Sequence, residues 1–369
     1  MRVMMVVGHK GVWSGSSFQV VWTLQNLSSI GLEVCGVWSE GSRADRETLK
    51  PLEEVNIPLW TLKMNRFLSF SAIYQLRQLI KDFKPDVIEA VKSPAQYLTL
   101  AALMGNSHPA LIFYRGISGK LGYFRSWKYR LPVVRRTIVN SEMLKRSLVE
   151  NDHLSPERVD VVYGEYDPQC DETVTENPIE IRKILGLPQD RFILALVGNY
   201  APWRGQKVAL RAAYLLKKSR LPFLFLFCGK ETERLQGEVR RLGLNDCVIL
   251  YPFRRDVLKV LRAAHIAINA STANESLSGA LINAQRLGIP AVATDVGGAK
   301  EIVVHNETGL IVPPGDAQAL AEGIEKLFSL GDTSLEAMGM KAQMRALALF
   351  SSQEKMRRRL ESYRRAMSQ

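Results

Sequence analysis

A carboxylate and a set of small residues stand together near position 275. Glu275 is followed by Ser276, Ser278 and Gly279, and then by an apolar run with helical spacing. Small residues at the beginning of a helix leave backbone N–H groups uncovered, and such groups bind anions. Glu275 could accept hydrogen bonds from a ligand, or it could only stabilise the helix dipole. The glycine turn at residues 296–298 is expected to bring the backbone close to a ligand.

Basic and amide side chains follow a strand earlier in the same half of the chain. The loop 199–205 begins with Asn199 and contains Arg204, and Lys207 stands in the helix that comes next. Arginine and lysine at such a position can contact a phosphate group. The simpler alternative for Arg204 is a solvated loop arginine.

A third candidate loop, rich in glycine and serine, occupies residues 8–17. Its glycines do not have the G-x-G-x-x-G spacing of a dinucleotide-binding loop. We expect Gly15 and Ser16 to approach a phosphate, with ordinary turn residues as the alternative. His9 is a candidate for contact with an acceptor, although a lone histidine is most often an ordinary surface residue.

These loops stand at the ends of strands in a regular alternation of strands and helices. Residues 1–7 form an apolar strand, a helix ends at Gly31, and residues 32–38 form the next strand. This βαβ pattern is typical of a doubly wound parallel sheet, which binds ligands at the carboxyl ends of its strands. The pattern restarts near residue 192, after a polar, proline-bearing segment.

We therefore predict an α/β protein with two doubly wound, Rossmann-like domains facing a cleft. A length of 369 residues also favours two domains. The predicted parts are an N-terminal domain at residues 1–168, a linker at residues 169–180 and a C-terminal domain at residues 181–348. A final helix, at residues 349–369, is predicted to pack back on the N-terminal domain.

The composition favours anionic partners and a reducing compartment. A net charge of +12 suits phosphorylated substrates or an anionic membrane face, and no nucleic-acid motif accompanies it. The four cysteines are scattered, without a CxxC or Cys/His cluster, which argues against structural zinc. No apolar run is long enough to span a membrane and no signal-peptide pattern is present, so we expect a cytoplasmic protein.

Residues 120–136 interleave basic and aromatic side chains and contain no acidic residue. This pattern is consistent with a membrane-surface patch that collects a lipid-linked or membrane-embedded acceptor. The alternative is a solvated basic helix with an aromatic side facing the core. Basic residues of the last helix, among them Arg359 and Arg364, would either join this patch or form a solvated face.

The stretch 274–316 resembles the donor-site region of the family 4 glycosyltransferases, which have the GT-B fold. The resemblance rests on Glu275 with a second polar position, Asn283, after seven intervening residues, and on the runs GIPAVATDVGGAKEIV and TGLIVPPGD. Weaker similarities extend over nearly the whole chain, in the runs LVGNYAPWRGQKVALRAA, VLKVLRAAHIAINAS, KPDVIEA and IVNSEMLKRSL.

The resemblance implies transfer of a sugar from a nucleotide donor with retention, without a bound metal or other cofactor. Glu275 would lie beside the transferred sugar. Positive charge and helix N-termini would neutralise the diphosphate that leaves. The residues that the resemblance assigns to the donor are Gly15, Ser16, Asn199, Arg204, Lys207, Ser278, Gly279 and Asn283.

Four positions depart from the family pattern. Asn283 stands where a second carboxylate would hold the ribose, and Asn199 stands where the family has an arginine. An amide can still bond a diol, but more weakly than a carboxylate. Arg115 and Glu89 replace two histidines of the first domain. We expect Arg115 to bind an anionic acceptor or to form a salt bridge.

We therefore expect a metal-independent hexosyltransferase in which Glu275 and Arg204 are the catalytic residues. It would move a hexose from a nucleotide-diphosphate sugar to a glycan or lipid-linked acceptor in surface polysaccharide or lipopolysaccharide biosynthesis, in the cytoplasm or at the inner face of the membrane. Two alternatives stay open: a divergent, catalytically weak GT-B protein that acts as a binding or regulatory partner, and a GT-B sugar-nucleotide epimerase.

Overall fold

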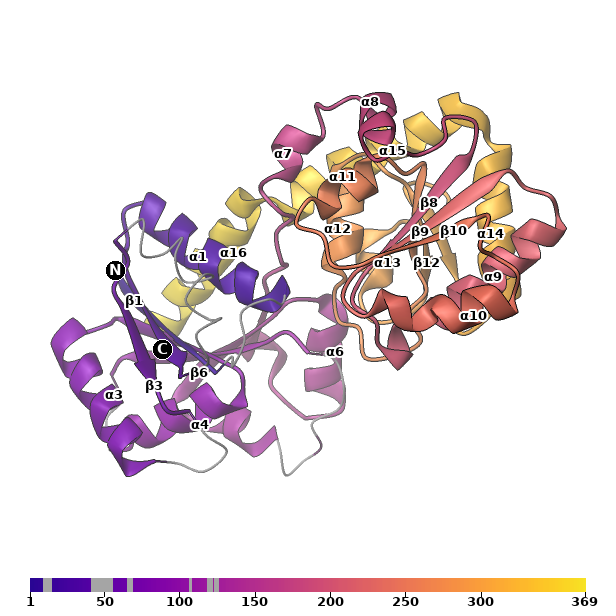
Figure 1. The fold of residues 1–369 in the computed structure, drawn as a ribbon. Helices are drawn as coiled ribbons and strands as arrows, with labels where there is room; N and C mark the ends of the chain where they lie inside the picture. Colours follow the sequence, from indigo (N-terminus) through magenta and orange to yellow (C-terminus); the bar gives the residue numbers. More distant parts are fainter. Residues whose placement is uncertain (9–14, 41–55, 65–68, 106–107, 118–121, 123–125) are drawn as a thin grey trace. The chain divides into compact units, whose positions relative to one another are not determined.

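Strands and helices alternate along the chain in the computed structural model, which describes residues 1–8, 15–40, 56–64, 69–105, 108–117, 122 and 126–369. The chain divides into two units (Figure 1). Unit 1 comprises Met1–Gly164 and Ser352–Gln369, and unit 2 comprises Glu165–Ser351. The last helix of the chain therefore belongs to the first unit.

Unit 1 is built on a parallel seven-stranded sheet. Its strands are β1 (Arg2–Val7), β2 (Glu33–Ser39), β3 (Leu59–Leu62), β4 (Val87–Val91), β5 (Ala110–Arg115), β6 (Val134–Val139) and β7 (Val159–Val161). Their order across the sheet is β3-β2-β1-β4-β5-β6-β7. In β1, Met4 and Val6 enter one hydrophobic core while Val3 and Met5 enter the other. Both faces are covered, which explains why the strand reads as one continuous apolar run.

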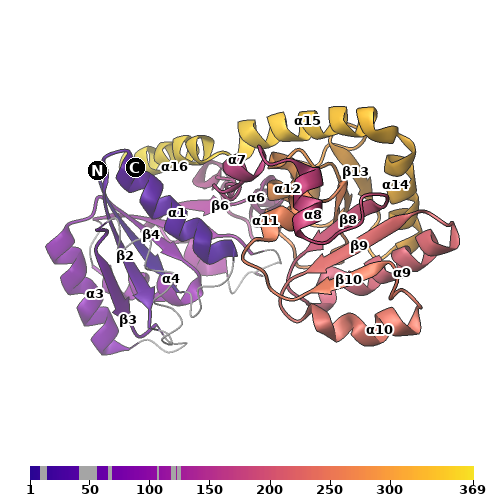
Figure 2. The same cartoon turned by 45° about the horizontal axis from the view of Figure 1, so that its top comes forward.

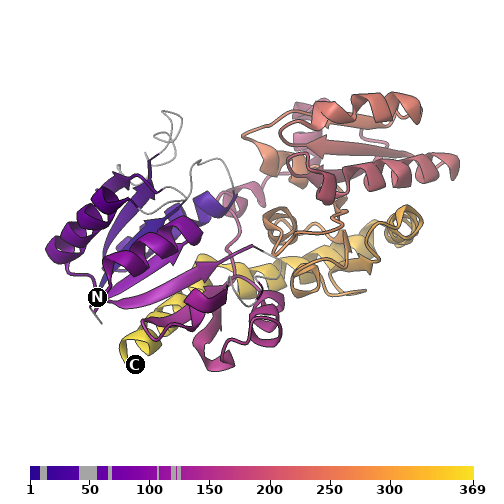
Figure 3. The same ribbon diagram turned by 90° about the horizontal axis from the view of Figure 1, so that it is seen from below.

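Helices cover the two faces of this sheet. The described helices of unit 1 are α1 (Gly15–Ser29), α3 (Phe70–Phe83), α4 (Ser93–Ala102), η2 (Trp127–Arg130), α6 (Glu142–Glu150), η3 (Pro156–Arg158) and α16 (Ser352–Met367). Helices α3 and α4 pack together, and their buried residues join the core of Met4. Helix α16 lies beside the sheet (yellow in Figure 3) and, with α1, fills the core of Val3.

Unit 2 repeats this architecture with six parallel strands. They are β8 (Phe192–Val197), β9 (Phe223–Cys228), β10 (Val248–Tyr251), β11 (Ile266–Asn269), β12 (Ala291–Thr294) and β13 (Gly309–Val312). Their order is β10-β9-β8-β11-β12-β13. The order reverses direction at β8 and β11, so the loops after these two strands lie at the point where such sheets bind ligands.

The helices of unit 2 form two layers. They are α7 (Cys170–Thr173), α8 (Pro178–Ile184), η4 (Pro202–Arg204), α9 (Gln206–Lys218), η5 (Thr232–Leu235), α10 (Gln236–Arg241), α11 (Val257–Arg262), α12 (Gly279–Arg286), α13 (Ala299–Ile302), α14 (Ala317–Ser329) and α15 (Gly331–Phe350). Helices α8, α11 and α12 lie on one face of the sheet, whereas α9 and α10 lie on the other (Figure 2).

The segment expected to be a linker is folded into unit 2. Residues 169–180 hold α7 and the beginning of α8, and both helices contact α11. Cys170 is fully buried, and Thr173 is nearly so. The polar composition of this segment suggested a loop, but its few buried side chains are enough to fix two short helices.

The described part of residues 120–136 is not a solvated basic helix. Residues 127–130 form η2 and residues 134–139 form β6. Lys128 and Arg136 are buried, and Arg136 pairs with Asp160. Sequence alone placed these cations on a surface because their partners come from distant parts of the chain.

Helix lengths and composition bear on membrane insertion. None of the helices within the described ranges is both long and apolar enough to cross a bilayer.

Candidate functional site

Three loops meet at the carboxyl edge of the unit 2 sheet. They follow β8, β11 and β12. The backbone N–H of Thr272 donates to the carbonyl oxygen of Trp203 over 2.7 Å, and this bond joins the first two loops. The hydroxyl of Thr294 donates to the carbonyl oxygen of Ser271 over 2.6 Å, and this bond joins the loop after β11 to the end of β12. The side chains on these loops are thus held in fixed relation to one another.

A glycine sets the position of the arginine in the first loop. Gly205 has a φ of +67°, and a Cβ atom there would lie 1.8 Å from the carbonyl oxygen of Ala270. Only glycine permits both the left-handed backbone and this close approach. Gly205 therefore brings η4, and with it Arg204, against the end of β11.

We expect Gly205→Ala to lower the free energy of unfolding by about 2–3 kcal/mol, because the methyl group strains the backbone and pushes the loop off β11. Urea denaturation followed by circular dichroism measures this change in the free energy of unfolding. The control is Gly237→Ala in α10, where a Cβ meets no atom within 4 Å. Equal stability of the two variants would contradict the role given to Gly205.

Glu275 and Arg204 form an ion pair at this edge. Arg204 Nη1 lies 3.4 Å from Glu275 Oε1, and the two side chains are 36% and 11% exposed. The other carboxylate oxygen accepts hydrogen bonds from the hydroxyl of Ser271 and, over 3.2 Å, from Asn269 Nδ2. A carboxylate has about four acceptor positions. These bonds fix the orientation of Glu275. Its oxygen on the side of Arg204 can still accept hydrogen bonds from a ligand.

The glycine turn after β12 supports the backbone of Glu275. A Cβ at Gly297, whose φ is +63°, would come within 2.1 Å of the carbonyl oxygen of Glu275. The N–H of Gly298 donates to the carbonyl oxygen of Ser276 over 2.6 Å. The close approach expected between this turn and a ligand is therefore made with residues 275–276 of the chain itself.

The beginning of α12 lies directly after this segment. Ser278 is the N-cap, and its hydroxyl accepts the backbone N–H of Leu281 over 3.4 Å. A Cβ at Gly279 would meet no atom within 4 Å, so the first residue of the helix faces open space. An uncovered helix N-terminus next to an arginine can bind an anion.

The side chain and the carbonyl group of Asn199 form hydrogen bonds with neighbouring segments of the chain. Its Oδ1 accepts the backbone N–H of Lys230 over 3.0 Å, and its carbonyl oxygen accepts Gln206 Nε2 over 3.1 Å. The first bond joins the segments after β8 and β9, and the second joins the loop after β8 to α9. Lys207 is exposed at the second position of α9. A Cβ at Gly198 would lie 3.4 Å from Arg204 Nη1, so the guanidinium group rests over this part of the loop.

Asn283 is bonded to the segment that begins unit 2. Its Oδ1 accepts the backbone N–H of Asp167 over 2.9 Å. Burial, the largest effect, and the nearby Glu165 both raise the pKa of Asp167. The amide of Asn283 thus holds the backbone of Asp167, which lies 116 positions away in the sequence.

The structure describes only some of the candidate site residues of unit 1. Gly15 and Ser16 begin α1, but their side chains are not described, and His9 lies outside the described residues. Arg115 ends β5 and hydrogen-bonds Tyr129, whose pKa is raised chiefly by burial. Arg115 also lies close enough to Lys128 to lower the pKa of that lysine.

Glu89 is a buried structural carboxylate. It is fully buried in β4, and Arg359 Nη1 donates to its two oxygens over 2.8 and 2.9 Å. Tyr363 donates to Glu89 Oε2 over 2.6 Å. The expectation of a solvated face at Arg359 is therefore wrong, since that side chain is only 4% exposed.

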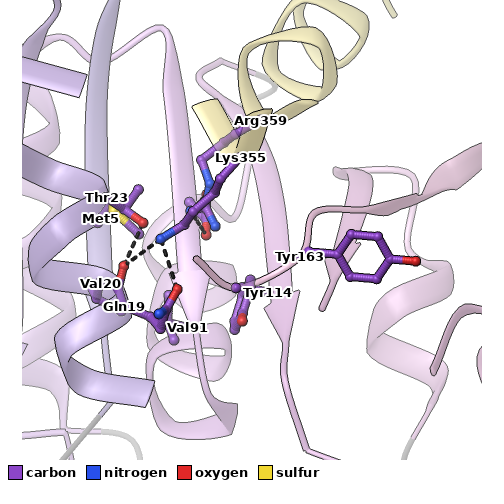
Figure 4. A pocket seen from close by; sticks show the side chains of 11 residues that line it. Met5, Gln19, Val20, Thr23, Val91, Tyr114, Tyr163, Lys355 and Arg359 are labelled. Carbon is purple, nitrogen blue, oxygen red and sulfur yellow. Dashed lines mark hydrogen bonds and ion pairs between the residues drawn. The ribbon is translucent and has the colours of Figure 1, made fainter. Parts of the chain in front are cut away.

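A small cavity lies beside this cluster (Figure 4). Its volume is about 10 Å³, which is room for about one water molecule. Lys355 Nζ crosses it to reach the backbone oxygen and Oε1 of Gln19, over 3.1 and 3.0 Å. The cavity is too small for a sugar, so these residues anchor α16 to unit 1.

Metal-binding groups are the remaining question for this site. Over the ranges that the structure describes, no three His, Cys, Asp or Glu side chains are grouped so as to hold a metal ion.

Two family models match the chain, one in each half. Residues 178–345 match the model of glycosyl transferases group 1, and residues 14–169 match that of glycosyltransferase family 4. Among curated proteins, the D-inositol 3-phosphate glycosyltransferase of Mycobacterium sp. (strain JLS) is 30% identical over 242 residues, which are 63% of this chain and 53% of that protein. The chain thus spans about half the length of the curated relatives that it matches.

Solved structures show the fold. A glycosyltransferase from Rickettsia africae ESF-5 superposes with a TM-score of 0.90 at 20% identity, over 99% of this chain and 98% of that one. HepE from Anabaena, in complex with UDP, superposes with a TM-score of 0.82 at 19% identity, over 98% and 99% of the two chains. The two sheets and their helices are thus those of the GT-B fold, as the sequence predicted. Taken with the two family matches, at residues 14–169 and 178–345, both halves of the chain are similar to glycosyltransferases.

Proposed function

We propose that this protein transfers a hexose, with retention, from a nucleotide-diphosphate sugar to a glycan or lipid-linked acceptor. The observation that carries the proposal is the pairing of Arg204 with Glu275 beside the open beginning of α12. The complexes of HepE with UDP and with UDP-glucose support the choice of donor class.

The chemistry of the leaving group explains the proposed roles. As the glycosidic bond breaks, negative charge grows on the nucleoside diphosphate. Arg204, Lys207 and the N-terminus of α12 would stabilise this charge without a metal ion. Glu275 would accept hydrogen bonds from hydroxyls of the sugar and hold it for transfer.

The remaining roles rest on the family resemblance. Asn283 would contact the ribose with its amide nitrogen, since its oxygen is bonded to Asp167. Gly15 and Ser16 of unit 1 would approach the diphosphate of the donor. His9 and Arg115 would contact the acceptor, and we propose unit 1 as the acceptor domain. We further propose that the protein works in surface polysaccharide or lipopolysaccharide assembly, at the cytoplasmic face of an anionic membrane. The net charge of +12 supports this location.

A donor screen tests this function. The purified protein is incubated with each common nucleotide sugar, and mass spectrometry follows the release of free nucleotide with and without a mixture of acceptors. We expect one donor to be consumed faster when acceptor is present. Conversion of the sugar nucleotide without release of nucleotide would instead indicate an epimerase.

Arg204→Gln is expected to lower kcat for the accepted donor by about 100-fold, because one charge on the leaving diphosphate is lost. Stopped-time assays of nucleotide release measure kcat for the variant and for the wild type. Arg211→Gln, an exposed arginine of the adjacent helix α9, is the control and should keep wild-type activity. An Arg204→Gln variant as active as this control would remove Arg204 from the proposed mechanism.

A further inference from the structure

The side chain of Asn269 has a fixed orientation at the end of β11. Its Oδ1 accepts the backbone N–H of Ser271 over 3.1 Å. An amide group has one oxygen that accepts hydrogen bonds and one nitrogen that donates them. Because the oxygen is bonded to Ser271, the nitrogen faces Glu275, and Asn269 Nδ2 donates to Glu275 Oε2 over 3.2 Å. The backbone of Ser271 thus decides which end of the amide meets the carboxylate.

A second donor reaches the same carboxylate oxygen. The hydroxyl of Ser271, a residue that is 2% exposed, donates to Glu275 Oε2. The other oxygen, Oε1, lies 3.4 Å from Arg204 Nη1. Two donors on one oxygen and a cation beside the other leave this carboxylate little freedom to rotate.

Thr294 holds the two donor residues from the neighbouring strand. It is fully buried at the end of β12, and its hydroxyl donates to the carbonyl oxygen of Ser271 over 2.6 Å. The same hydroxyl lies 3.4 Å from the carbonyl oxygen of Asn269. Asn269 is also paired with Ala293 in the parallel ladder of β11 and β12. The bonds to Glu275 therefore connect it to the sheet and not only to its own loop.

A turn alone would not require an asparagine at position 269. The bond from the N–H of Ser271 to Oδ1 is an Asx turn, which aspartate forms as well as asparagine does. Aspartate would place a second carboxylate against Glu275, and like charges at such a distance destabilise each other. The nitrogen of Asn269 is therefore the part of the side chain that the turn does not need and that Glu275 uses.

We propose that Asn269 is a positioning residue for sugar transfer and acts through Glu275. This inference rests on the proposed function and adds to it a residue that the donor-site pattern did not include. Asn269 and Ser271 hold Oε2, so that Oε1 meets the sugar in one orientation. A displacement of about 1 Å near a reacting centre lowers the rate about 100-fold. The loss of Asn269 should therefore lower the rate of transfer and leave the binding of the nucleotide unchanged.

Two substitutions separate the turn from the nitrogen. Asn269→Asp keeps an oxygen for Ser271 but replaces the donor with a negative charge, whereas Asn269→Leu removes both groups. Each variant is expected to lower kcat for the accepted donor by about 10- to 100-fold. Asn245→Asp, at an exposed position of the same unit, adds the same charge elsewhere and should keep the wild-type kcat. An Asn269→Asp variant as active as this control would overturn the proposal, because the turn would then be the whole role of Asn269.

Nucleotide affinity gives the readout that a loosened loop would change. Calorimetric titration of Asn269→Leu with UDP and with GDP should give a Kd within about threefold of the wild type while kcat falls. If the substitution only disordered the loops after β8 and β11, Arg204 would move as well and the nucleotide would bind more weakly. Equal losses in kcat and in nucleotide affinity would therefore overturn the positioning role. Circular dichroism shows that each variant is folded.

A double variant tests the route through Glu275. In the Glu275→Gln background the charge that Asn269 orients is absent, so Asn269→Leu should lower the residual rate by less than about threefold. A further loss of about 10- to 100-fold would show that Asn269 acts independently of Glu275 and would contradict the proposal. Failure of the proposed function is recognised separately, since the wild type itself would then neither bind a nucleotide nor transfer a sugar. Failure of this inference alone leaves an active wild type with equally active Asn269 variants.

Discussion

Glu275→Gln is expected to lower kcat/KM for sugar transfer by about 1000-fold. Glutamine keeps the size of the side chain and an oxygen for Ser271 and Asn269, but it removes the charge that faces Arg204. The sugar then loses its charged acceptor, and Arg204 loses the partner that orients it. Electrostatic groups at reacting centres have effects of about this size. Initial rates with the accepted donor and acceptor measure the change.

Two controls separate chemistry from folding. Glu307→Gln, an exposed carboxylate of the same unit, should keep wild-type rates. The melting temperature of Glu275→Gln should stay within a few degrees of the wild type, because its neutral hydrogen bonds are retained. Full activity in a folded Glu275→Gln variant would contradict the role proposed for this carboxylate.

Arg359→Met is expected to lower the free energy of unfolding by about 3–5 kcal/mol, because buried Glu89 loses its cationic partner and keeps only the hydrogen bond from Tyr363. Burial by itself lowers the pKa of Arg359, yet Glu89 holds it above its ordinary value. Arg359 therefore keeps its charge in the folded protein. Urea denaturation of the variants measures the loss.

A double variant gives the stricter test. Glu89→Gln combined with Arg359→Met removes both charges and should recover much of the loss, which a double-mutant cycle quantifies. Arg364→Gln, on the exposed side of the same helix, should change stability by less than about 0.5 kcal/mol. Additive losses in the double variant would show that the two side chains act independently.

Much of the fold could be predicted from local pattern. The apolar run at β1 and the helix after it determine a βαβ unit, and the same pattern repeats from residue 192. Helix α15 was not predicted, because apolar residues such as Met340 and Met344 lie exposed on it and blur its amphipathic pattern. Strand β3 was also not predicted.

The candidate site was predictable in residue types but not in contacts. Arg204 and Glu275 were singled out separately, 71 positions apart. Their pairing depends on how tightly the loop after β8 approaches β11, which Gly205 determines. The same limit applies to Asn199, whose side chain bonds the backbone of Lys230. Local spacing does not reveal which groups a side chain meets across two loops.

Long-range charge pairs were the least predictable feature. The run of three arginines at residues 357–359 suggests a solvated helix face, but Arg359 turns inward to Glu89, 270 positions away. Sequence distance of this kind leaves no local signal. Glu89 itself stood out only because the family has a histidine at that position.

The central claim is that unit 2 holds a nucleotide-sugar donor, and calorimetric titration of the full chain with UDP and with GDP tests it most directly. We predict saturable binding of one of the two nucleotides at one site, with a Kd of about 1 μM to 1 mM, weakened in Arg204→Gln and unchanged in Arg211→Gln. Flat titrations with both nucleotides would contradict the claim and favour a GT-B protein that acts only as a binding or regulatory partner.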